Sequence, residues 1–474
     1  MTVYALIDES IVAQAFAMRR ETPTPEPVRE GPILTPAWAY GSVIRERSGE
    51  FRMWYMAPPG YCEYYATSRD GLTWDLPCLD LVSPDVDAGP NAFLCSYQKD
   101  ATGRWLVGQT GPEGFSVLDA EAQPHPAANH RFTALYLASF GEGCDMPAPS
   151  GLCIAYSDDG LHWIADEHNP VVPGWHDTSN CLMFDDRSGK YVIYGRPPVH
   201  VEVGTNANRL VSRMESADLV HWTSPRIILD TDDRDADALL LTDEGQFRED
   251  GGDGERIRGR DRQFYGMTAF QSAGLYVGLA QIYDIPSGNT WLELVHSRDG
   301  VDWIREPRRE PYIAPRPDSW ESREVRPAMA TPPVVCGEDW WIYYSASPHS
   351  HHAGKASEGR GIGARSLKRD RWARYRSADR EAELLTHPFD SAGTGLALNA
   401  APEPGGWVRV AVTDEWGKTL PGFSHEDCVP ITGDAISHGV TWRGEGRPGA
   451  WPDRVRLRIR SRHASIYAFY MGDA

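Results

Sequence analysis

The sequence predicts an all-β protein that consists of a five-bladed β-propeller followed by a C-terminal β-sandwich. The first observation is a recurring heptapeptide, Ser-x-Asp-Gly-x-x-Trp, which stands at 68–74, 157–163 and 297–303. Looser copies at 216–222 and 366–372 keep the same interval from Ser to Trp. The second observation is the composition, because 17 Trp and 20 Tyr with 45 Gly and 36 Pro are typical of strands joined by tight turns. Five copies of one turn indicate five copies of a larger structural unit.

The repeated heptapeptide has the chemistry of a hairpin turn. Its Asp side chain can accept hydrogen bonds from backbone N–H groups, and its Gly tolerates a positive φ. The Trp would then open the next strand and bury its ring against a neighbouring sheet. The carboxylates of these turns are therefore assigned a structural role. They belong to Asp70, Asp159, Asp218 and Asp299.

The chain divides into three parts. Residues 1–34 form an acidic, proline-rich arm, which we expect to cross the first repeat or to close the ring. The propeller spans 35–382, where aromatic and β-branched runs predict four strands in each repeat; the second repeat is expected to begin with a strand at 91–97. The repeats are longer than a minimal blade, so extra loops must connect some strands. Residues 383–474 lack the repeat, and their alternation of apolar and polar residues predicts the β-sandwich.

Charge and cysteine usage limit the partners and the location of the protein. The formal net charge of −20 argues against nucleic acid or an anionic membrane as a partner. No stretch is apolar for long enough to span a bilayer, and no signal-peptide pattern is evident. The eight cysteines are scattered without a Cys-x-x-Cys pair, which favours reduced thiols in a cytoplasmic protein over a disulfide framework or a zinc site. An acidic run at 230–237 lacks the Gly and Glu of a calcium loop, so we predict no metal and no cofactor.

Candidate site residues cluster where inner strands begin and where second strands end. In a propeller these positions converge on one pocket, and carboxyls from different blades would suit glycoside hydrolysis. We predict Asp177 and Glu324 as the principal catalytic carboxylates, with Asp261 and Glu321 in reserve. The alternative for each acid is a turn cap or an ion-pair partner. The residues expected to contact a substrate are Arg196, Arg326, His349, Trp38, Tyr40, Asn180 and Tyr265.

The histidines at 349–352 leave several interpretations open. They could line the pocket, bind a metal or lie in a solvated loop.

The heptapeptide resembles the Asp-box of sialidases, although Gly directly follows Asp here. Residues 35 to about 380 resemble the five-bladed propeller glycosidases of glycoside hydrolase families 32 and 43. The likeness rests on Tyr-Ala-Thr-Ser-Arg-Asp-Gly-Leu-Thr-Trp at 65–74 and on a sandwich that ends in Ile-Tyr-Ala-Phe at 466–469. The resemblance implies a carbohydrate substrate and a pair of catalytic carboxylates. The sequence departs from family 32 at 36–41, where no acid replaces the first-blade Asp, and it lacks the Glu-Cys motif of the acid/base.

These observations predict a glycoside hydrolase that cleaves a glycosidic bond of a small or oligomeric carbohydrate with carboxylates in the central pocket. One alternative is a glycan-binding propeller without catalysis, suggested by the missing first-blade acid. Another is a glycoside phosphorylase, in which Arg323, Arg326 and the histidines would bind phosphate. A homo-oligomer is compatible with the sequence, and the C-terminal domain is expected to buttress the propeller.

Overall fold

The computed structural model describes residues 2–58, 62–126, 129–141, 143–177, 179–198, 209–235, 262–353, 358–391, 395–443 and 451–472. Within these ranges the regular structure is almost entirely β-strand, and the helices are short 3₁₀ turns: η1 (Glu9–Ile11), η3 (Asp233–Asp235) and η4 (His351–Ala353). The predicted all-β class is therefore confirmed. None of the helices in the described ranges has the length and apolar character that crossing a membrane requires.

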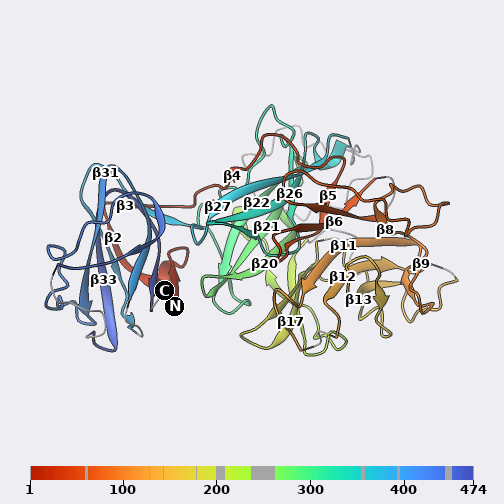
Figure 1. Ribbon diagram of the computed structural model, residues 1–474, viewed down its shortest axis with the longest axis horizontal. Coiled ribbons are helices and arrows are strands. Elements are labelled where there is room, and N and C mark those ends of the chain that lie inside the picture. Colours follow the sequence, from red (N-terminus) through yellow and green to blue (C-terminus); the bar gives the residue numbers. More distant parts are fainter. Residues whose placement is uncertain are drawn as a thin grey trace.

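Most of the chain folds into five antiparallel units of four principal strands (Figure 1). Aromatic and β-branched residues fill their second strands, as is typical of strands buried on both faces. The first two units contain β5 (Trp38–Arg45), β6 (Phe51–Ala57), β7 (Cys62–Ser68) and β8 (Ala92–Leu94), then β11 (Thr110–Asp119), β12 (Phe132–Ser139), β13 (Ser150–Ser157), β14 (Ile164–Ala165) and the added β15 (Val172–Pro173).

The next two units contain β16 (Cys181–Asp185), β17 (Lys190–Gly195), β18 (Val211–Ser216) and β19 (Arg226–Leu229), then β20 (Arg262–Ser272), β21 (Leu275–Asp284), β22 (Asn289–Ser297) and β23 (Trp303–Arg305). The fifth unit contains β24 (Glu324–Ala328), β25 (Val334–Cys336), β26 (Asp339–Ser347), β27 (Gly361–Lys368) and β4 (Glu26–Pro27).

The first strands of the five units surround one axis. β5 contacts β11, β11 contacts β16, β16 contacts β20, β20 contacts β24, and β24 contacts β5, so the contacts close into a ring. A small cavity on this axis is lined from all five units, by residues that include Tyr40, Gly114, Asn180, Met267 and Ala328. This cyclic arrangement is that of a five-bladed β-propeller, and the units are called blades 1 to 5 from here on.

The repeated turns fasten neighbouring blades to one another. In blade 2, Asp159 Oδ1 accepts two backbone N–H hydrogen bonds of 2.8 Å, and Gly160 has a φ of 82°. The carbonyl of Gly160 accepts a hydrogen bond of 2.7 Å from the indole N–H of Trp54 in blade 1. Equivalent bonds from second-strand aromatics run from Tyr343 to Gly71 and from Tyr194 to Gly300. The structural role predicted for the turn carboxylates is confirmed by this hydrogen bonding.

The C-terminal domain is one nine-stranded sheet around a single apolar core. One edge of β33 (Arg454–Met471) pairs with β31 (Leu396–Asp414), and the other edge pairs in turn with four short strands. In Figure 1, β31 and β33 run along this domain beside the propeller. The short strands of the sheet are β1 (Thr2–Ala5), β2 (Val12–Phe16), β3 (Met18–Glu21), β28 (Arg374–Ser377), β29 (Ala382–Thr386), β30 (Phe389–Asp390) and β32 (Ala435–Gly439).

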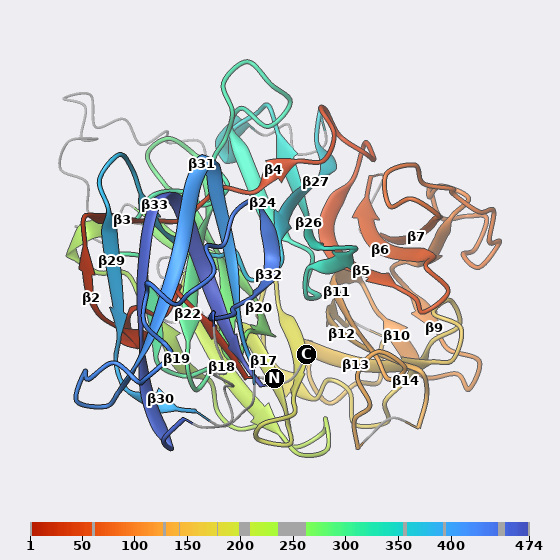
Figure 2. The same ribbon diagram turned by 60° about the vertical axis from the view of Figure 1, so that its left-hand side comes forward.

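The N-terminal segment is not a separate arm. Its first three strands belong to the C-terminal sheet, and Figure 2 shows β2 and β3 beside β29 and β33. Its fourth strand, β4, pairs with β27 as the outermost strand of blade 5, so the segment does take part in closing the ring. β28 also joins the C-terminal sheet, so this domain begins before residue 383. The chain therefore passes between the two domains twice, once between β3 and β4 and once between β27 and β28.

Blade 2 begins later than the sequence suggested. The strand predicted at 91–97 is β8, the outermost strand of blade 1, and not the first strand of blade 2. The prediction failed because Trp74 does not open a strand: only an isolated bridge, Thr67↔Asp75, follows this turn. A short hairpin of β9 (Gln98–Lys99) and β10 (Trp105–Val107) then precedes the true inner strand, β11.

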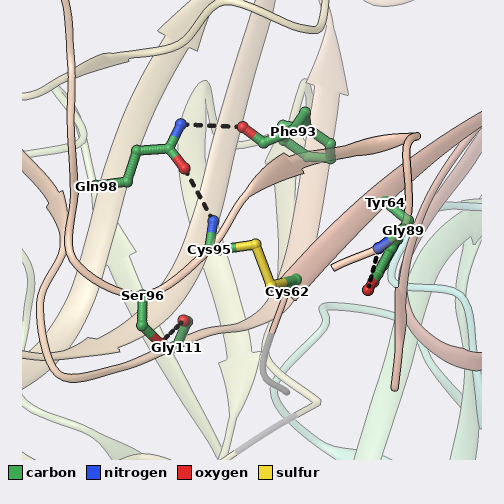
Figure 3. The surroundings of a disulfide bond; sticks show 8 residues. All are labelled: Cys62, Tyr64, Gly89, Phe93, Cys95, Ser96, Gln98 and Gly111. Carbon is green, nitrogen blue, oxygen red and sulfur yellow. Dashed lines mark hydrogen bonds between the residues drawn. A yellow bond between two sulfur atoms is a disulfide. The ribbon is translucent and has the colours of Figure 1, made fainter. Parts of the chain in front are cut away.

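Two of the eight cysteines form a disulfide. Cys62 on β7 and Cys95 just after β8 are bonded although they are 33 residues apart in the sequence (Figure 3). The prediction of reduced thiols is therefore wrong for this pair, since the strand pairing of β7 with β8 brings together residues that no sequence pattern links. The other six cysteines are free. A cytoplasmic location stays a prediction, and this disulfide does not support it because disulfides persist in oxidising compartments.

Candidate functional site

The candidate site lies at the end of the axis where β24 begins. Nη1 of Arg326 donates a hydrogen bond of 2.9 Å to the hydroxyl of Tyr40 on β5. The same guanidinium lies 4.8 Å from the ring centroid of Tyr265 on β20. Glu324, Tyr40, Tyr265 and Asp177 together raise the pKa of Arg326, against the opposing effect of burial. Residues from blades 1, 3, 4 and 5 therefore meet around this one side chain.

Glu324 is the buried anion of the site, and its side chain is 0% exposed. Its Oε1 lies 3.3 Å from Nε of Arg326 and 3.2 Å from Nδ1 of His351, and its Oε2 accepts a hydrogen bond from Arg360. Burial alone would raise the pKa of Glu324, but Arg326, His351 and Arg360 outweigh it and lower that pKa to about 2. Glu324 is therefore ionised at neutral pH and cannot act there as a proton donor.

Asp177 reaches the site from the loop that precedes β16 in blade 3. It forms an ion pair with Arg196, which follows β17 and is 2% exposed. The Asp177 side chain is 20% exposed, so this carboxylate lies closer to solvent than Glu324 does. Its backbone has a φ of 55°, and its carbonyl accepts a hydrogen bond of 2.7 Å from Nδ2 of Asn180. Asn180 therefore shapes the loop that holds Asp177.

Guanidinium groups surround the ring of Tyr265. Besides Arg326, the guanidiniums of Arg196 and Arg209 lie 5.7 and 5.4 Å from its centroid, which are cation–π distances. His351 meets the same ring edge-on at 5.4 Å. The ring of the half-buried Trp38 has its centroid 5.7 Å from the guanidinium carbon of Arg360. The site thus combines aromatic rings with several cations.

A further carboxyl, that of Glu113, lies beside Asp177. Glu113 is on β11, the inner strand of blade 2, and is 6% exposed. A side chain at the adjacent Gly114 would come within 3.5 Å of the backbone N of Ser179, so β11 runs close to the loop of Asp177. Burial and the negative charge of Asp177 raise the pKa of Glu113 to about 7. This carboxyl can therefore hold or release a proton near neutral pH.

A second buried carboxyl, that of Glu63 on β7, interacts with Glu113. It is 0% exposed, and neither of its carboxyl oxygens has a hydrogen-bond partner among the described residues. Burial and the charge of Glu113 raise the pKa of Glu63 well above its ordinary value. Its neighbour Cys62 carries the disulfide to Cys95, which fixes the start of this strand.

The structure brings together most of the residues predicted from the sequence, but not all of them. Glu321 is buried within blade 5, where it forms ion pairs with Arg316 and Arg365 and accepts a hydrogen bond from the hydroxyl of Tyr344. The backbone N–H of His349 donates a hydrogen bond to the hydroxyl of Ser347, and within the described part of the chain its ring forms no hydrogen bond or ion pair with the clustered residues. Asp261 lies outside the described residues. The predicted residues that do meet at the site are Asp177, Glu324, Arg196, Arg326, Trp38, Tyr40, Asn180 and Tyr265.

Sequence reasoning missed Glu63, Glu113, Arg209, Arg360 and His351. Glu113 could have been found from the interval between Ser68 and Ser157, the longest in the repeat, which leaves room for another inner strand after 97. His351 belongs to the histidine cluster at 349–352, but the sequence pattern does not single it out from its neighbours. Glu63, Arg209 and Arg360 stand within or beside strands, and nothing in the sequence marks a strand Glu or Arg as buried.

Among the described residues, no group of three or more His, Cys, Asp or Glu side chains has the arrangement of a metal site.

Comparison with known proteins finds similarity at the level of overall shape only. No family model matches the sequence, and no curated protein matches it. Among solved structures, a thermostable family-43 glycoside hydrolase has a TM-score of 0.46 at 13% identity, covering 72% of this chain and 92% of its own.

Two further solved structures belong to the same broad class of enzymes. An endo-arabinase from Bacteroides thetaiotaomicron has a TM-score of 0.46 at 11% identity, covering 73% of this chain and 97% of its own. An exo-inulinase from Aspergillus awamori has a TM-score of 0.39 at 10% identity, covering 95% and 98%. These are glycoside hydrolases of the kind that the sequence motifs resemble. Identities this low do not establish an activity.

Proposed function

We propose that the protein is a glycoside hydrolase in which Glu113 is the general acid and Asp177 is the carboxylate that attacks the sugar or activates water. The observation that carries this proposal is the contrast between two neighbouring carboxyls. Burial and the charge of Asp177 raise the pKa of Glu113 to about 7, whereas Asp177 is more exposed and carries its charge in an ion pair with Arg196. Glycosidases use such a pair, with one carboxyl protonated and the other ionised.

The remaining site residues have supporting parts in this proposal. Glu324 holds Arg326 and Arg360 in place, and is not the proton donor because the pKa of its carboxyl is lowered to about 2. Tyr40 and Trp38 lie against these guanidiniums and would contact a bound sugar. Glu113 replaces Glu324 as the partner of Asp177, which changes the pairing expected from the sequence.

The test is hydrolysis of a panel of aryl glycosides and oligosaccharides by the wild-type protein and by two variants. Glu113→Gln and Asp177→Asn should each lose at least about a hundredfold in kcat/KM on the best substrate, since general acid–base groups contribute about 10²–10⁴-fold. Glu167→Gln is the control, because this Glu is 66% exposed in a surface pair with Arg104. Thermal melting checks that the variants remain folded.

Three other results would contradict the proposal or alter it. Less than a tenfold loss in both variants would remove Glu113 and Asp177 from the reaction. Binding of sugars without any product would favour a glycan-binding propeller. Release of a sugar 1-phosphate only when phosphate is present would make the protein a phosphorylase.

A further inference from the structure

Two buried guanidiniums share a single carboxylate at this site. The side chains of Arg326 and Arg360 are each 5% exposed, and both pair with Glu324, which is 0% exposed. Arg326 takes one carboxylate oxygen and Arg360 takes the other. Within the described ranges, no other Asp or Glu forms an ion pair with either guanidinium. Two guanidiniums therefore share one carboxylate here, and the next anion, Asp177, acts on Arg326 from beyond ion-pair distance and is itself paired with Arg196.

Such an arrangement is electrostatically incomplete. A guanidinium does not deprotonate in proteins, so neither Arg can relieve the repulsion by losing its charge. Burial and the charge of Arg326 both lower the pKa of the Arg360 guanidinium, which is the direction expected for two cations that face each other. An added anion stabilises buried positive charges, and a bound ligand can supply this anion.

Further guanidiniums and aromatic rings lie near Arg326, although the protein as a whole is acidic. Arg209 lies 5.4 and 5.0 Å from the ring centroids of Tyr265 and Tyr283, and Arg196 lies on the same Tyr265 ring. The whole chain has a formal net charge of −20. A ligand with a negative charge would be repelled by most of the surface and accepted here, which makes this charge a basis for specificity.

We propose that the site accepts a sugar that carries a carboxylate, a uronic acid residue, and that Arg326 and Arg360 bind this carboxylate. The planar guanidinium groups match a carboxylate in shape and donate charge-assisted hydrogen bonds to it. The proposal rests on the proposed function, because it names the class of sugar that the same site would cleave. Inorganic phosphate offers similar anionic oxygen atoms to these guanidiniums, so the tests below distinguish a sugar carboxylate from phosphate as the bound anion.

The binding test compares sugars that differ only at carbon 6. Sodium D-glucuronate and D-galacturonate are titrated calorimetrically into the full-length protein, against D-glucose and D-galactose. A uronate should bind at least about tenfold more tightly than its neutral partner, because a hydrogen bond to a charged group contributes about that much. Arg360→Gln should remove most of this preference and leave Glu324 paired with Arg326. Arg187→Gln, which removes a guanidinium that packs on Tyr276 away from the site, should retain the preference.

The activity test uses 4-methylumbelliferyl glucuronides and galacturonides with the matching glucosides and galactosides, each with and without inorganic phosphate. Preferential cleavage of the acidic glycosides supports the proposal. Preferential binding of a uronate also supports it, even without cleavage, and the lack of cleavage would then contradict only the proposed hydrolysis. Equal binding of acidic and neutral sugars overturns the proposal, even if a neutral glycoside is hydrolysed. Turnover of neutral glycosides that requires phosphate also overturns it, since the guanidiniums would then bind phosphate. If Arg360→Gln does not fold, the wild-type comparisons decide the matter.

Discussion

Glu113 and Asp177 come from neighbouring blades, and the negative charge of Asp177 helps burial to raise the pKa of Glu113 to about 7. A general acid must be protonated, so the raised pKa keeps Glu113 competent below neutral pH. We expect kcat/KM to fall about tenfold per pH unit above about pH 7, as Glu113 loses its proton. A pH profile on the best substrate measures this alkaline limb.

The contribution of Asp177 can be measured without turnover. In Asp177→Asn the pKa of Glu113 should fall, because one of the two causes that raise it is removed. Infrared difference titration of the protonated carboxyl stretch reports this pKa, and Glu113→Gln identifies the band. An unchanged titration in Asp177→Asn would show that the two carboxyls do not interact.

Glu63 should make the stability of the protein depend on pH. Its folded-state pKa lies well above 4.5, the ordinary value for a glutamate, so its contribution to stability is present below about pH 4.5 and is lost as the pH rises through the folded pKa. Glu63→Gln keeps the shape and cannot ionise. We compare the free energy of unfolding of this variant with that of the wild type at pH 5 and at pH 8. The difference should be more favourable to the variant at pH 8 by at least about 1 kcal/mol, since one pKa unit corresponds to about 1.4 kcal/mol.

Urea denaturation at the two pH values measures this difference. The exposed Glu167 provides the control, because Glu167→Gln should change stability by less than about 0.5 kcal/mol at either pH. Equal effects of Glu63→Gln at pH 5 and pH 8 would mean that the buried carboxyl does not titrate in this range.

The pH dependence of stability that Glu324 causes is opposite in direction to that of Glu63. Its folded-state pKa is lowered to about 2, so its contribution to stability is present above about pH 4.5 and is lost between that pH and about 2. Glu324→Gln should cost about 3–5 kcal/mol at pH 7, because it leaves two buried guanidiniums without their anion. Arg360→Gln should cost clearly less, since Glu324 retains Arg326. Chemical denaturation compares the two variants, and equal losses would argue against the sharing of one carboxylate.

The repeat could be recognised from sequence because its hydrogen bonds are local. Ser68, Ser157, Ser216 and Ser297 end the third strands of blades 1 to 4, and each bonds the Asp two residues later. A turn of this kind needs particular residues at fixed offsets, which a sequence displays directly. The number of units and the all-β class followed from it.

The proposed pair of Glu113 and Asp177 could not be predicted in the same way. Asp177 precedes an inner strand that the sequence predicts correctly. Glu113 lies on β11, which the sequence does not predict, because its pattern indicates 91–97 as the inner strand of blade 2. The burial of Glu63 could not be predicted for another reason. A Glu within a strand usually faces solvent, and only the packing of β7 against β11 decides that this one is buried.

The bond between Trp54 and Gly160 predicts how blades 1 and 2 are held together. A Cβ at Gly160 would lie 2.8 Å from the Trp54 ring, and its φ of 82° is strained for any other residue. Gly103 is the control: it has a φ of 87°, and a Cβ there would meet no atom within 4 Å. Gly103→Ala therefore introduces backbone strain without a steric clash. We expect about 1–2 kcal/mol of destabilisation for Gly103→Ala and about 2–4 kcal/mol for Gly160→Ala, measured by urea denaturation. Equal losses would show that contact with Trp54 adds nothing.

The disulfide between Cys62 and Cys95 closes a loop of 33 residues that contains the whole of β7 and β8. Constraining a loop of this length in the unfolded chain stabilises the folded state by about 3–4 kcal/mol. The double variant Cys62→Ala/Cys95→Ala should lose about this much, whereas Cys78→Ala, at an exposed free thiol, should lose little. Dithiothreitol should lower the melting temperature of the wild type to that of the double variant, and should leave the double variant unchanged. Two results together would contradict this prediction: dithiothreitol does not change the wild-type melting temperature, and the double variant is as stable as the wild type. Strand pairing alone would then hold this edge of blade 1.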